Sequence, residues 1–119
     1  MNQLLTELKN KCSVDVDDTL NRFADAEKLY VKFLFRFVKD ENFQKLKTQA
    51  ETDTYDENSI YYAHSFKGVS GNLGMTLLFE KFKEIESDIN DNNFSAVNAK
   101  IQSVNDNYNL IIDTIKQFS

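Results

Sequence analysis

The C-terminal end of the chain carries the pattern that most limits the possible fold. Between residues 94 and 118, apolar side chains recur at alternating steps of three and four residues. These residues are Phe94, Val97, Ile101, Val104, Tyr108, Ile111, Ile115 and Phe118. A seam with this spacing requires a long helix that packs at a shallow angle against other helices.

Shorter apolar stripes predict further helices over residues 2–12, 26–40, 43–51 and 75–90, with a short one that carries Leu20 and Phe23. Asp15 or Asp17 is expected to cap the short helix, and Asp25 the helix over 26–40. That helix is expected to bury one broad face, made of Leu29, Tyr30, Phe33, Leu34, Phe37 and Val38. No stretch alternates with period two. The prediction is therefore an all-α chain, an antiparallel four-helix bundle with short N-terminal helices.

Length and composition narrow the class of protein. At 119 residues the chain is expected to form a single domain over 1–119. It has no apolar run near the roughly 18 residues that span a bilayer, and residues 1–3 do not resemble the start of a secretory signal. The single cysteine, Cys12, is expected to fill an apolar face, which fits a cytoplasmic protein. A net charge of −5 argues against a nucleic-acid partner, and no membrane partner is expected.

One segment, residues 63–74, holds the only histidine and all three glycines. Apolar residues at Tyr62, Phe66, Val69 and Leu73 predict a helix over about 55–73, which Thr54 and Glu57 would start as a capping box. On this helix the side chain of His64 falls opposite the apolar face, so its imidazole should meet solvent. Four more residues share that side: Ile60, Lys67, Gly68 and Gly71.

The glycines on the histidine side need an explanation, because a glycine inside a helix costs about 1 kcal/mol relative to alanine. The apolar pattern continues past Gly68 to Leu73, so this glycine does not end the helix. A glycine at this position is explained if another protein must come close to the helix there. Gly71 and Gly74 have two possible roles. Each could serve the same close approach, or could end the helix, where glycine is common.

The arrangement of His64, Lys67 and Gly68, followed by Gly74, resembles the His-x-x-Lys-Gly motif of histidine-containing phosphotransfer (HPt) domains. The resemblance runs from about residue 14 to about residue 93. Glu86, preceded by an isoleucine, falls where this family places an aliphatic residue followed by Glu or Gln. The chain departs from the family at two points: Val69 replaces a usually small residue, and no proline marks the turn after Asp40.

The resemblance implies that His64 accepts a phosphoryl group from a receiver-domain aspartyl phosphate, or from a hybrid kinase, and passes it to another response regulator. Lys67 would balance phosphoryl charge, and Glu86 would accept a hydrogen bond from the non-reacting ring nitrogen, whichever that is. Ile60, Tyr61, Gly68 and Gly71 would form the docking patch. The protein would be a monomeric phosphocarrier rather than an enzyme, without cofactor or metal of its own, and Mg²⁺ would belong to the partner receiver.

A second hypothesis belongs to another class: a helical adaptor that docks a receiver or other partner through the same surface without chemistry. The chain lacks a glycine-rich nucleotide loop, so it is not expected to be a kinase. It also lacks the Glu-x-x-His pair of di-iron bundles, since Tyr61 stands three residues before His64. Whether the chain is free-standing or part of a hybrid kinase stays open.

Overall fold

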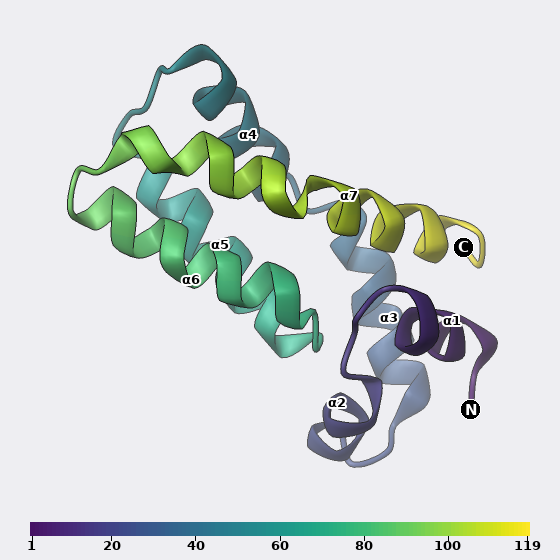
Figure 1. The fold of residues 1–119 in the computed structure, drawn as a ribbon. Helices are drawn as coiled ribbons and strands as arrows, with labels where there is room; N and C mark the ends of the chain where they lie inside the picture. Colours follow the sequence, from purple (N-terminus) through teal and green to yellow (C-terminus); the bar gives the residue numbers. More distant parts are fainter.

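The computed structural model describes all residues from Met1 to Ser119 and is entirely helical, which confirms the all-α prediction (Figure 1). Its elements are α1 (Gln3–Lys11), α2 (Val16–Arg22), α3 (Glu27–Phe37), α4 (Asn42–Thr52), α5 (Ser59–Asn72), α6 (Thr76–Asn90), the 3₁₀ helix η1 (Phe94–Ala96) and α7 (Val97–Lys116). None of them combines the length and the apolar content that crossing a bilayer requires.

The last four α-helices pack against one another. Helix α5 packs between α4 and α6, and α7 packs against both α4 and α6. Helices α1 and α3 also contact α7. Figure 1 shows α1, α2 and α3 gathered near the C-terminal end of α7, which gives an elongated molecule of 43 × 24 × 20 Å.

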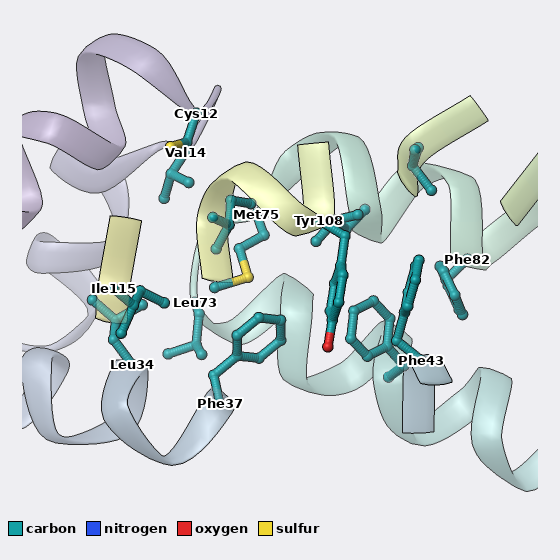
Figure 2. Close-up of a cluster of buried hydrophobic side chains, with 14 of the residues drawn as sticks. Cys12, Val14, Leu34, Phe37, Phe43, Leu73, Met75, Phe82, Tyr108 and Ile115 are labelled. Atoms are coloured by element: carbon teal, nitrogen blue, oxygen red, sulfur yellow. The ribbon is translucent and has the colours of Figure 1, made fainter. Parts of the chain in front are cut away.

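The apolar seam of α7 is buried as its spacing predicted. Its six central members are buried, and the two at the ends, Phe94 and Phe118, are half-buried. Aromatic rings fill the centre of the core (Figure 2): Phe43 stacks on Tyr108 with ring centroids 3.9 Å apart, and Phe66 packs 4.5 Å from Phe82. Aromatic side chains bury the largest apolar areas, so this cluster anchors α4, α5, α6 and α7 to one another.

The short N-terminal helices follow the sequence prediction. Asp15 caps α2 by accepting a hydrogen bond from the backbone N–H of Asp18. Cys12 is buried, with its sulfur 3.6 Å from the hydroxyl of Thr114, and burial raises the pKa of its thiol. The thiol therefore stays protonated and serves as an apolar filler.

Helix α3 differs from its prediction in three ways. It ends at Phe37 rather than at residue 40, and its N-cap is Ala26, because Asp25 adopts a positive φ of 61° and makes no cap. Leu29, expected in the core, is 43% exposed. The fully buried face is narrow, Tyr30, Leu34 and Phe37, whereas Phe33 and Val38 are half-buried against the core.

The N-terminal segment is hydrogen-bonded to the turn between α5 and α6. Val14 and Met75 form an isolated antiparallel bridge, and the backbone N–H of Asp15 donates to the carbonyl of Gly74 at 2.8 Å. We call these contacts the N-terminal clamp. Next to it, the hydroxyl of Tyr30 donates to the carbonyl of Leu73 at 2.8 Å. Burial raises the pKa of Tyr30 to about 12, so the hydroxyl remains a donor.

Replacement of Tyr30 by Phe should destabilise the fold by about 1–3 kcal/mol, because the buried carbonyl of Leu73 loses its donor. Urea unfolding followed by circular dichroism measures the free energy of unfolding. Tyr61→Phe is the matched control, since Tyr61 is 62% exposed and makes no side-chain hydrogen bond. Equal stabilities of the two variants would show that the Tyr30 hydroxyl contributes nothing.

Candidate functional site

The helix that carries His64 begins later than predicted. Helix α5 starts at Ser59, not near residue 55, and the Thr54–Glu57 capping box is wrong. A neighbouring pair supplies the bonds instead: the backbone N–H of Asp56 donates to the Ser59 hydroxyl at 3.0 Å, and the Asp56 carboxylate accepts from the N–H of Asn58 at 2.8 Å. The Ser59 hydroxyl in turn donates to Gln49 of α4, which fixes the start of α5 against that helix.

Helix α5 buries a face centred on small residues. Ser59, Ala63, Phe66 and Ser70 are buried, so that α4 and α6 approach closely, whereas Tyr62 and Val69 at the edges are half-buried. The opposite side meets solvent. The side chain of His64 lies there and is 70% exposed.

Three side chains form the site cluster, His64, Lys67 and Glu86. Nδ1 of His64 lies 2.6 Å from Oε2 of Glu86, and Nζ of Lys67 donates to Oε1 of the same carboxylate at 2.6 Å. Helix α6 supplies Glu86, so α5–α6 packing assembles the cluster. Each carboxylate oxygen thus serves one donor.

Electrostatics keep this carboxylate ionised. Partial burial would raise the pKa of Glu86, but the hydrogen bonds and positive charge of Lys67, together with the bond to His64, outweigh it and lower the pKa below its ordinary value. The side chain is only 16% exposed, which shields the pair from water. By linkage, the stability that these bonds contribute is present above the ordinary carboxyl pKa and is lost as the pH falls through the lowered one.

The hydrogen bond to Glu86 also assigns the tautomer of the imidazole. A carboxylate can only accept, so in the neutral ring Nδ1 carries the hydrogen and Nε2 keeps its lone pair. Nε2 has no hydrogen-bond partner within the chain. The side chain is therefore an exposed imidazole with a fixed ring and a free basic nitrogen.

The four predicted docking residues differ in their surroundings. Tyr61 is 62% exposed, and Ile60 is half-buried against the core. A Cβ atom added to Gly68 would meet no atom within 4 Å, so this glycine leaves open space beside His64. At Gly71 a Cβ atom would lie 2.6 Å from a ring carbon of Phe79. The group that comes close to Gly71 in this structure is therefore a side chain of the chain's own helix α6.

The two roles left open for Gly71 and Gly74 now separate. Gly74 follows the end of α5 with a positive φ of 77°, its N–H donates to the carbonyl of Gly71, and the N–H of Met75 donates to the carbonyl of Ser70. This pattern is a Schellman motif, which ends a helix at a glycine. Gly71 lies inside the helix and does not end it.

Sequence reasoning missed two residues beside the cluster. Phe79 and Arg22 border a shallow hollow that Gly68 and Gly71 also line, and Nη2 of Arg22 donates to the Gly71 carbonyl at 3.4 Å. Phe79 could have been noticed in the sequence. It follows the core residue Leu78, at a position where the apolar stripe of α6 predicts a polar surface residue, yet it is aromatic. No local sequence pattern points to Arg22, because its contact with the Gly71 carbonyl joins two helices that are far apart in the sequence.

The site holds no candidate metal centre. Nowhere in the chain do three His, Cys, Asp or Glu side chains come close enough together to bind a metal ion. Comparison with known proteins finds no matching family model, no similar curated protein and no similar solved structure.

Replacement of Glu86 by Ala should release the imidazole, because Nδ1 loses its acceptor, and the ring should then populate both tautomers. Glu86→Gln should have an intermediate effect, since the amide keeps one acceptor oxygen and has an NH₂ donor in place of the other, so His64 and Lys67 cannot both keep their present bonds. Imidazole ¹⁵N chemical shifts at a pH where the ring is neutral report the tautomer. Glu80→Ala is the control, an exposed glutamate on the same helix without an ion pair. An unchanged Nδ1–H tautomer in Glu86→Ala would contradict the assigned role.

Proposed function

We propose that this protein is a histidine phosphotransfer domain that carries a phosphoryl group on Nε2 of His64. The observation that supports this most is the exposed imidazole, whose Nδ1 is held by Glu86 while Nε2 faces solvent without a partner. A neutral imidazole with a free basic nitrogen is a competent nucleophile near neutral pH.

The transfer step follows from this geometry. The Nε2 lone pair attacks the phosphorus of an aspartyl phosphate on a receiver domain, the bond from phosphorus to the aspartyl oxygen breaks, and the aspartate leaves as a carboxylate. The ring then bears the phosphoryl group on Nε2 and a hydrogen on Nδ1, with a positive charge that the Glu86 carboxylate stabilises. In the onward step a carboxylate oxygen of the next regulator's aspartate attacks the phosphorus, the N–P bond breaks, and its electron pair returns to Nε2.

Lys67 has a role in this proposal that the sequence motif alone does not specify. Its ammonium neutralises Glu86 at 2.6 Å, so the carboxylate that orients the ring does not repel the incoming phosphoryl group. Each oxygen of Glu86 accepts from one donor, Oε2 from His64 and Oε1 from Lys67. Loss of Lys67 would therefore leave Oε1 unpaired and the charge of this partly buried carboxylate without its counter-ion, next to the reacting phosphoryl group.

The packing of α4, α5, α6 and α7 supports an antiparallel four-helix bundle as the scaffold of the domain, with α1–α3 as an extension. Each of these helices touches two of the others, and short turns join successive helices. The helix that carries His64 has α4 on one side and α6 on the other. Its third side, with the imidazole, is open to a partner.

The proposed partners are a response-regulator receiver domain and a histidine or hybrid kinase. Tyr61 and the open space at Gly68 flank the imidazole, so a partner backbone can come close to Nε2. Mg²⁺ and the groups that assist the aspartyl phosphate belong to the receiver in this proposal. The protein itself would be a cytoplasmic, monomeric phosphocarrier and not an enzyme.

Replacement of His64 by Gln should abolish phosphoryl uptake and leave the fold intact, since the side chain is exposed. The assay mixes the protein with a panel of ³²P-labelled phosphorylated receiver domains and scores acid-labile, base-stable label. As a control, Asn98→His in the His64→Gln background adds an exposed imidazole on α7 and should not restore labelling. Receiver binding without label transfer to the unmodified protein would favour the adaptor hypothesis instead.

Gly68 gives a second test that separates docking from folding. Both Gly68→Ala and Gly68→Leu should hold or raise stability, by up to about 1 kcal/mol for Ala, because a helical glycine is removed and no atom is in the way. Transfer should be nearly normal for Ala and much slower for Leu, whose side chain stands beside the imidazole. Thermal unfolding and the labelling assay measure the two effects. Transfer at the normal rate by Gly68→Leu would show that no partner approaches at this position.

A further inference from the structure

A second feature lies away from Nε2 of His64, where α3 faces the C-terminal end of α5. A hollow of about 500 Å³ opens there, within the range of roughly 300–1,000 Å³ typical of small-molecule sites. Its apolar lining consists of Phe23, Phe33, Phe37, Val69 and Leu73. Phe23 and Phe33 lie 5.8 Å apart and form an aromatic wall on one side.

Two arginines border this apolar surface. Arg22 is held by its hydrogen bonds to the Thr19 hydroxyl and the Gly71 carbonyl, and pairs with Asp18. Arg36 has no carboxylate within salt-bridge distance, and its guanidinium lies over the ring of Phe33 at 5.3 Å. A planar guanidinium that rests on an aromatic wall keeps its outer N–H groups available for an anion.

The other charges near the hollow favour an anion as well. Asp40 also borders it, but its carboxylate accepts hydrogen bonds from the backbone and side chain of Asn42. On the solvent side of α3 and in the turn that follows it, cations recur at steps of four, four and three residues and form no salt bridge: Lys28, Lys32, Arg36 and Lys39, with Glu27 beside the first of them. Like charges one turn apart repel and destabilise a helix, so this row of cations on α3 does not serve the stability of the helix. This chain, with a net charge of −5, thus carries a local positive field beside an apolar hollow.

We propose that the hollow between α3 and α5 binds a small amphipathic anion: a flat apolar body against Phe23 and Phe33, with a carboxylate, sulfonate or phosphate group on Arg36. Arg22 offers a second, weaker contact because Asp18 already pairs with it. The site is independent of His64 and does not depend on the phosphotransfer proposal.

The probe is the dye anilinonaphthalene sulfonate, an aromatic body with one negative charge, added to the folded full-length protein. Dye fluorescence should rise to saturation at one dye per chain, and amide NMR shifts should change at the end of α5 and along the second half of α3. Arg36→Gln should weaken binding by roughly fivefold, the upper end for an exposed ion pair. Lys83→Gln, an equal charge change on α6, should leave it within twofold.

Two further measurements separate the charge from the apolar surface. Phenylnaphthylamine, the uncharged analogue of the dye, should bind the unmodified protein and Arg36→Gln equally well. Val69→Phe, which fills the hollow, should abolish binding of both dyes while circular dichroism shows a folded chain. Shifts that map elsewhere, no saturable binding, or equal losses in Arg36→Gln and Lys83→Gln would each overturn the proposal.

Discussion

Burial of the apolar seam of α7 is the interaction on which the rest of the structure depends. Helices α1, α3, α4 and α6 all pack against this one helix, so its regular spacing sets where the others lie. The stacked pair Phe43–Tyr108 marks the point where α4 meets it, and Phe66 of α5 joins the same aromatic cluster. Helix α5 lies between α4 and α6, which both pack on α7, so the outward position of His64 depends on α7 through these two helices.

The sequence predicted the parts of the fold that depend on local periodicity, because a stripe of apolar residues identifies a helix whatever it packs on. It failed where tertiary neighbours decide. Leu29 belongs to an apolar stripe but is exposed, since nothing covers that side of α3. The start of α5 was misplaced because Asp56 and Ser59, not Thr54 and Glu57, make the hydrogen bonds at its N-terminus, and Ser59 also bonds to Gln49 of another helix.

The same distinction applies to the site. His64 and Lys67 lie one turn apart on one helix, so their proximity was predictable from spacing. That Glu86 accepts from both depends on the α5–α6 register, which no local pattern specifies; only the family resemblance pointed to it. Because the two donors share one carboxylate, each residue has a distinct role. In the proposed mechanism Glu86 orients the ring, and the ammonium of Lys67 neutralises the Glu86 carboxylate.

The site cluster also has a kinetic consequence, because His64 and Glu86 are only 22 residues apart in the chain. They lie on consecutive helices joined by a turn of a few residues, and closing so short a loop costs little conformational entropy. The ring can therefore meet its carboxylate as soon as this helical hairpin forms. The N-terminal clamp joins Val14 to Met75 across a much longer stretch of chain, so we expect it to close after the hairpin has formed.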